Sequence, residues 1–262
     1  MTAARHVVAL SPRLRAVPAP RRAAAPRPLV VVPAHDEARS LPGVLADLRA
    51  FCPGAPVLVV DDGSGDGTWR VAEAHGAAWL RFDARLGVGG AMTAGFRYAA
   101  RHGCAPVVRV DGDGQHAAGD AAALLERLER DAVDVVLGSR YAFGRRRDGS
   151  VPRQLAQALL ASLLSWLTSE RVTDPTCGCA AFGQRAVDLL AEHHPSGYPE
   201  PELHLLFRRS GLRVVEHPIQ ARARTAGHST LTTARLWGAA ARVALAMVVV
   251  PLRSHPADSP RA

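Results

Sequence analysis

The chain has 262 residues, of which 48% are apolar, and a formal net charge of +8. This length allows one large domain, or one domain with tails, and the apolar content allows a sizeable core. All 32 basic residues other than His are Arg, and Ala is abundant, which is typical of high-GC coding bias. The charge by itself therefore does not choose between nucleic acid, anionic lipid and phosphorylated substrates. The N-terminal residues lack the apolar run that is typical of a signal peptide. The four Cys include no C-x-x-C pair, so we expect them to be reduced thiols of a cytosolic protein.

The elements expected in chain order alternate between apolar runs and amphipathic segments. Residues 1–27, rich in Ala, Pro and Arg, are expected to be disordered. Strands are predicted at 28–32, 57–60, 77–82, 107–110, 133–137, 180–182 and 212–219. Helices are predicted at 40–51, 68–75, 90–102, 118–130, 152–170 and 201–209. One more helix is predicted after the strand at 180–182, and it ends at residue 190. This alternation predicts an α/β domain over residues 28–230, with a mostly parallel central sheet flanked by helices.

The C-terminal part holds an apolar stretch of 17 residues at 236–252, interrupted by Arg242. A helix that spans a membrane needs about 20 apolar residues, so this stretch is short for a span. We expect an apolar C-terminal helix over 231–253, either lying on a membrane surface or packed on the domain. Residues 254–262 are expected to form a disordered tail.

Polar and acidic residues follow three of the predicted strands. Pro33-Ala-His-Asp-Glu37 follows the first strand, Asp61-Asp-Gly-Ser-Gly-Asp-Gly67 the second, and Asp111-Gly-Asp-Gly-Gln115 a later one. Ligands of open α/β sheets bind at the carboxyl ends of the strands. Carboxylates that gather there would repel one another unless a cation lies between them. The three clusters therefore predict one acidic pocket with a divalent cation that bridges substrate phosphates.

The most specific of these clusters is the D-x-D run at Asp111 and Asp113. The alternation can bring both carboxylates to one ligand, and Gln115 adds a neutral oxygen ligand. Gly112 and Gly114 leave room for a diphosphate. Taken alone the run is also compatible with an ordinary Asp-Gly turn, and its position after a third strand favours the binding site.

Two neighbouring motifs allow other interpretations. Residues 62–73 fit the spacing of an EF-hand calcium loop, but such a loop follows a helix and this one follows a predicted strand. Leu86-Gly-Val-Gly-Gly90 precedes a helix and could bind phosphate through backbone N–H groups. It lacks the third glycine of the dinucleotide fingerprint, because Met92 occupies that place, so a simple helix-start loop is the safer interpretation.

Taken together and in order, the motifs resemble those of glycosyltransferase family two. Within that family the chain is similar to the dolichyl- and polyprenyl-phosphate sugar synthases, which implies a GT-A fold. The resemblance covers residues 28–219 and extends through 230. It rests on L-V-V-V-P-A-H-D-E at 29–37, V-V-D-D-G-S-G-D-G-T at 59–68, L-G-V-G-G-A at 86–91, D-G-D-G-Q-H at 111–116, G-S-R-Y at 138–141, V-T-D-P-T-C-G-C-A-A-F at 172–182 and R-T-A-G-H-S-T at 224–230.

The resemblance implies roles for individual residues. The nucleotide sugar would be held by Pro33, Ala34, His35, Glu37, Asp62, Asp111, Gly112, Asp113, Arg224 and Ser229. Mg²⁺ or Mn²⁺ would be held by Asp111, Asp113 and Gln115. Roles in catalysis would fall to Asp113, Arg140, Arg224 and Glu202.

Two positions depart from the family pattern. Asp36 stands where Asn is usual, and Thr230 stands where the late loop often carries Lys. The lost charge at Thr230 affects the phosphate clamp of that loop, for which His228 and Arg222 are substitute candidates.

The function implied is transfer of a sugar from a GDP- or UDP-sugar, with inversion, and polyprenyl phosphate is the favoured acceptor. The Arg cluster at 140–153 and the apolar helix that follows favour a lipid phosphate, at the inner face of the cell membrane. One alternative is a hydroxyl acceptor, in a cell-envelope glycan or a small molecule, which requires a base such as Glu200 or Glu202. A second alternative is a non-catalytic protein that binds a nucleotide sugar. Nucleic-acid binding is a distant third, and we expect no nucleic-acid partner because the predicted pocket is acidic.

Overall fold

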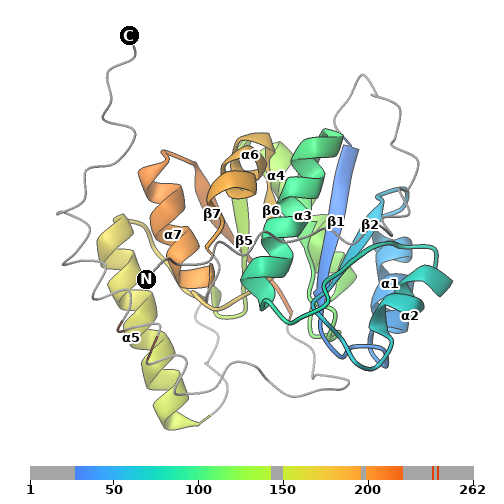
Figure 1. The fold of residues 1–262 in the computed structure, drawn as a ribbon. Helices are drawn as coiled ribbons and strands as arrows, with labels where there is room; N and C mark the ends of the chain where they lie inside the picture. Colours follow the sequence, from blue (N-terminus) through green and yellow to red (C-terminus); the bar gives the residue numbers. More distant parts are fainter. Residues whose placement is uncertain (1–26, 143–149, 196–198, 221–237, 239–240, 242–262) are drawn as a thin grey trace, which may run out of the picture.

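The computed structural model describes residues 27–142, 150–195, 199–220, 238 and 241. Within these ranges strands and helices alternate, as predicted, and build a seven-stranded sheet in the order β3-β2-β1-β4-β6-β5-β7 (Figure 1). The strands are β1 (Arg27–Ala34), β2 (Val57–Asp61), β3 (Ala78–Arg81), β4 (Cys104–Arg109), β5 (Val135–Ser139), β6 (Ala180–Phe182) and β7 (Val214–Pro218). The helices are α1 (Leu41–Phe51), α2 (Thr68–Ala74), α3 (Val88–His102), α4 (Ala118–Arg130), α5 (Val151–Thr168), α6 (Gln184–His193) and α7 (Pro199–Arg209).

The centre of the sheet is made by strands with continuous apolar runs, which is typical of strands buried on both faces. In β1 the side chains alternate between two cores. Val30 and Val32 pack with α1 and α4 on one face, and Leu29 and Val31 pack with α3, α6 and α7 on the other. The helices contribute one apolar stripe each, such as Leu41, Val44, Leu45 and Leu48 of α1.

One strand runs against the others. The pairs β1–β2, β1–β4, β2–β3 and β5–β7 are parallel, whereas β6 pairs antiparallel with both β4 and β5. The sheet is therefore mostly parallel, as predicted. The reversed β6 brings residues 172–179, which precede it in the chain, to the edge of the sheet where β4 and β5 end.

Helix α5 lies at one end of the sheet beside α7, and α1 and α2 lie at the other end (Figure 1). Helix α5 packs through Leu160 and Leu164 against Val172 and α7. None of the helices in the described ranges has the length and apolarity that crossing a bilayer requires. The predicted C-terminal helix at 231–253 lies outside the described residues except for Gly238 and Ala241, which are helical, and the tails at 1–26 and 254–262 lie outside them as well.

Candidate active site

Three loops that follow adjacent strands meet at one edge of the sheet. Because β2, β1 and β4 are neighbours and parallel, their carboxyl ends lie together. The Asp62 N–H donates to the Ala34 carbonyl at 2.8 Å, and the Gly112 N–H donates to the Pro33 carbonyl at 3.3 Å. The expectation that the three acidic clusters share one edge is therefore confirmed.

The loop after β1 is held by the loop after β2. His35 Nδ1 lies 2.7 Å from the Asp62 carbonyl oxygen, and the Asp36 N–H donates to Ser64 Oγ at 3.0 Å. The Glu37 N–H donates to Thr68 Oγ1 at 2.9 Å. Asp36 has a φ of +55°, a region in which Asn and Asp are the best tolerated residues with a side chain. Asp therefore retains the backbone geometry that the usual Asn would give.

The carboxylate of Asp62 fixes a third loop. Its two oxygens accept the N–H groups of Leu86 and Gly87, each at 2.7 Å. Those two residues directly precede α3, so Asp62 organises the Leu86–Gly90 motif. A contact of Asp62 with a base or ribose remains a prediction.

The D-x-D residues lie on the loop after β4. A side chain at Gly112 would crowd this loop, because a Cβ there would lie 3.2 Å from the Ala34 Cβ. Asp113 is 7% exposed, and its Oδ1 accepts the Gln115 N–H at 3.0 Å. Asp111 Oδ1 accepts from Arg109 Nε at 3.0 Å, and its Oδ2 lies 3.6 Å from His116 Nε2. Burial alone would raise the pKa of Asp111, but the charge of Arg109 and the contact with His116 hold it below the ordinary value.

The side chains of this loop offer oxygen donors to a divalent metal ion. No group of three or more His, Cys, Asp or Glu side chains within the described ranges could hold a metal ion alone. Mg²⁺ is usually bound by one or two carboxylates, while waters and substrate phosphates complete its shell. Asp111, Asp113 and the Gln115 amide oxygen fit that mode of binding, in which the diphosphate of a donor supplies further ligands.

Arg109, to which the sequence motifs assign no role, also contacts this site. Arg109 lies in the predicted central strand and is 5% exposed. Its Nη1 donates to Glu200 Oε1 at 2.8 Å, so Arg109 connects Asp111 to the first turn of α7. An Arg inside a buried apolar strand was the available signal, because such a residue is almost never buried without partners.

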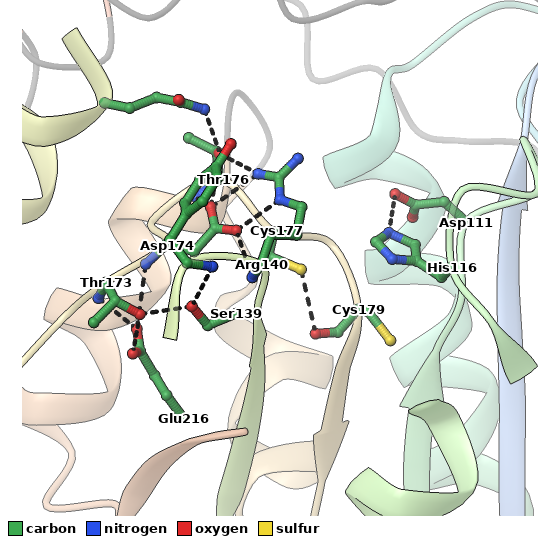
Figure 2. A network of polar contacts seen from close by, with 12 residues as sticks. Asp111, His116, Ser139, Arg140, Thr173, Asp174, Thr176, Cys177, Cys179 and Glu216 are labelled. Atoms are coloured by element: carbon green, nitrogen blue, oxygen red, sulfur yellow. Dashed lines mark hydrogen bonds and ion pairs between the residues drawn. The ribbon is translucent and has the colours of Figure 1, made fainter. Parts of the chain in front are cut away.

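A second polar network surrounds Arg140 at the end of β5 (Figure 2). Its Nε and Nη2 donate to the two carboxylate oxygens of Asp174, at 2.7 and 2.9 Å, and Nη2 also donates to Thr176 Oγ1 at 2.7 Å. Burial opposes the charge of Arg140, but its hydrogen bonds with Asp174 outweigh it and raise the pKa of the guanidinium. Ser139, Thr173 and Glu216 extend the network toward β7. Arg140 thus holds the 173–176 segment, and its contact with a phosphate remains a prediction.

The other residues predicted to act in catalysis or donor binding differ in whether the structure describes them. Arg224 and Ser229 lie outside the described residues, as do the substitute candidates Arg222 and His228. Glu202 is partly buried in the first turn of α7. Glu200, in the same turn, is connected to Asp111 through Arg109.

A mostly parallel sheet covered on both faces, with carboxylates at the ends of three adjacent strands, defines the GT-A class of nucleotide-sugar transferases. Solved structures share this fold. Glucosyl-3-phosphoglycerate synthase from Mycobacterium tuberculosis, in complex with Mn²⁺, UDP and glucosyl-3-phosphoglycerate, matches with a TM-score of 0.63 and 23% identity, over 87% of this chain and 80% of that one. Mannosyl-3-phosphoglycerate synthase from Rubrobacter xylanophilus matches with a TM-score of 0.65 and 20% identity, over 90% and 78%.

The chain belongs to glycosyl transferase family 2, whose sequence profile matches residues 29–190, and it is a glycosyltransferase. Polyprenol monophosphomannose synthase from Mycolicibacterium smegmatis is 31% identical over 229 residues, covering 83% of this chain and 86% of that protein. Undecaprenyl-phosphate mannosyltransferase from Micrococcus luteus is 34% identical over 240 residues, covering 82% and 96%. The resemblance inferred from the motifs is therefore confirmed.

Proposed function

We propose that this enzyme transfers mannose from a nucleoside-diphosphate sugar to polyprenyl phosphate, with inversion at the anomeric carbon. The observation that carries the proposal is the presence, in one domain, of the strand-end carboxylates and of an exposed apolar face on α5. The names of the two relatives that are more than 30% identical support both the sugar and the acceptor.

The donor half of the reaction rests on the loops after β1, β2 and β4. Pro33, Ala34, His35, Glu37 and Asp62 would line the base and ribose, and Gly112 would leave room for the diphosphate. Asp111, Asp113 and Gln115 would hold Mg²⁺ or Mn²⁺, which when bound supplies positive charge to the leaving diphosphate. Arg224 and Ser229 would contact the same diphosphate.

The acceptor half follows from the chemistry of the nucleophile. A phosphate oxygen of the lipid would attack the anomeric carbon as the bond to the diphosphate breaks, and the electron pair of that bond would leave with the nucleoside diphosphate. Because a phosphate monoester is anionic at neutral pH, this displacement needs no strong general base. The pairing of Glu200 with Arg109 agrees with that requirement, because an ion-paired carboxylate is a poor proton acceptor. A hydroxyl acceptor would need a base, for which Glu202 is the candidate.

The proposal is tested by supplying acceptors that differ in the phosphate alone. Purified enzyme with Mn²⁺ and GDP-mannose should label undecaprenyl phosphate but not undecaprenol, which presents only a hydroxyl. UDP-glucose in parallel reports the choice of donor. Labelling of undecaprenol, or of neither acceptor with either donor, would refute the proposed acceptor.

Helix α5 provides the proposed contact with the inner face of the cell membrane. Val151, Leu155, Leu159 and Trp166 are all exposed, Val151 at 76% and Trp166 at 74%, and this spacing places them on one side of the helix. In the described ranges they make up four of the six large apolar side chains that are exposed. An exposed apolar stripe of this kind is typical of a surface that meets a partner or a membrane.

The double variant Leu155→Ser/Trp166→Ser is expected to bind vesicles of anionic phospholipid at least about tenfold more weakly than the wild type. Burying each of these side chains in lipid contributes roughly 1.5–3 kcal/mol, and their exposure in the protein means that the fold should not suffer. Co-sedimentation with vesicles measures the effect. Phe51→Ser is the matched control, since Phe51 is 53% exposed and belongs to α1, a helix at the other end of the sheet from α5. Equal binding by the double variant and this control would contradict the assignment of α5.

A further inference from the structure

Arg109 is unusual because it carries a charge within the apolar strand β4. Its side chain is 6% exposed, and it has two acidic partners on different parts of the chain. Nε donates to Asp111 Oδ1 at 3.0 Å and Nη1 donates to Glu200 Oε1 at 2.8 Å. A buried charge is expensive unless it is paired and hydrogen-bonded. Both bonds use the fixed fork of the guanidinium, so they also relate the two acids in space.

We propose that Arg109 is a positioning residue that fixes the carboxylate of Asp111 for the metal and the donor diphosphate, with Glu200 of α7 as its anchor. The inference rests on the proposed function, because it assumes that Asp111 meets the metal-bound donor. Asp111 is contacted from two sides, by Arg109 at Oδ1 and by His116 at Oδ2. Its orientation is thereby defined before any ligand binds.

The segment before β6 closely approaches this pair. A Cβ at Gly178 would lie 2.5 Å from Arg109 Nη2 and 2.6 Å from Asp111 Oδ2, closer than real Cβ contacts. The segment before β6 therefore reaches the pair only because residue 178 has no side chain. This close approach limits the alternative positions open to both side chains.

The charges of Arg109, Asp111 and Glu200 allow two roles of Arg109 to be distinguished, namely orienting the Asp111 carboxylate and balancing its charge. Arg109 and Glu200 together contribute no net charge, so Asp111 keeps its negative charge for a cation. Removing Glu200 alone leaves the Arg109 charge to neutralise Asp111. Removing both charges restores the net charge of the wild type, but Asp111 then loses its donor at Oδ1 and keeps only the contact of Oδ2 with His116. If Arg109 only balances charge, the double variant should behave like the wild type.

The test compares Glu200→Gln with Arg109→Met/Glu200→Gln in calorimetric titrations of GDP, or of UDP, in the presence of Mn²⁺. We expect both variants to bind the nucleoside diphosphate with Mn²⁺ about tenfold more weakly or worse, the loss typical when a residue that orients a metal ligand is removed. The double variant should also have a lower kcat. Wild-type affinity in the double variant would overturn the proposal.

Gly178→Ala provides an independent variant that keeps every charge and displaces the pair by steric contact. It should weaken the same binding, and it decides the outcome if the double variant does not fold. Arg185→Met is the matched control, because Arg185 pairs with Asp134 at the surface and should bind like the wild type. If the wild type itself binds neither GDP nor UDP with Mn²⁺, the proposed function fails. If it binds and the variants bind equally well, the positioning role alone fails.

Discussion

The Asp113→Asn variant is expected to lose about 10²–10³-fold in kcat/KM, the loss typical when one group that stabilises developing charge is removed. Asp113 is nearly buried on the loop after β4, and its Oδ1 accepts the Gln115 N–H. Asn can keep that hydrogen bond, so the substitution removes the charge and preserves the turn. If Asp113 holds the metal and diphosphate as proposed, the leaving group loses stabilisation in the transition state.

Initial rates with Mn²⁺, GDP-mannose and undecaprenyl phosphate measure this effect, and thermal unfolding should show an unchanged melting temperature. Asp188→Asn is the control, because Asp188 is an exposed acid on α6 that bonds Gln184. Its activity should equal that of the wild type. An Asp113→Asn enzyme within a factor of three of the wild-type rate would exclude Asp113 as a metal ligand.

The Arg140→Met variant is expected to lose about 3–5 kcal/mol of folding stability, because it leaves a buried carboxylate without its partner. The Asp174 side chain is fully buried and accepts two hydrogen bonds from the Arg140 guanidinium. For a domain of this size the loss corresponds to a melting temperature lowered by roughly 6–20 °C. Transfer to polyprenyl phosphate should fall as well, because Arg140 holds the 173–176 segment.

The pH dependence identifies the cause of that loss. Burial would raise the pKa of Asp174, but its hydrogen bonds with Arg140 lower it below the ordinary value. The pair therefore contributes stability above the unfolded pKa of about 3.9, and this stability is lost as the pH falls through the lower folded pKa. Urea unfolding should show that Arg140→Met differs from the wild type by less at pH 3, which lies below the unfolded pKa, than at pH 7. A pH-independent difference would contradict the ion-pair explanation. Arg185→Met, in an exposed pair, should cost no more than about 1 kcal/mol.

Much of the fold was predictable because local patterns and tertiary structure agree. The continuous valine runs of β1, β2 and β4 are typical of strands whose side chains are buried on both faces of a sheet. The acidic clusters followed those strands directly, and parallel pairing then placed them at one edge. The residue roles inferred from the family resemblance, including those of His35, Glu37 and Glu202, stay predictions.

Other features depend on contacts between residues distant in sequence. The three residues of β6 carry no signal for their direction, which follows from where the chain arrives after α5. Arg109 and Glu200 are 91 residues apart, and Arg140 and Asp174 are 34 apart, so no local spacing links either pair.

The sequence by itself determined the α/β architecture, the family and the position of Asp111 and Asp113 after a central strand, because hydrophobic periodicity and short loops act over a few residues. Only the tertiary structure decided which side chains hold those carboxylates. It showed that Asp62 fixes the loop before α3, that Arg140 pairs with Asp174, and that Arg109 links Asp111 to α7. The physical reason is that a buried charge must find a partner wherever packing brings one, and packing is not encoded in local spacing.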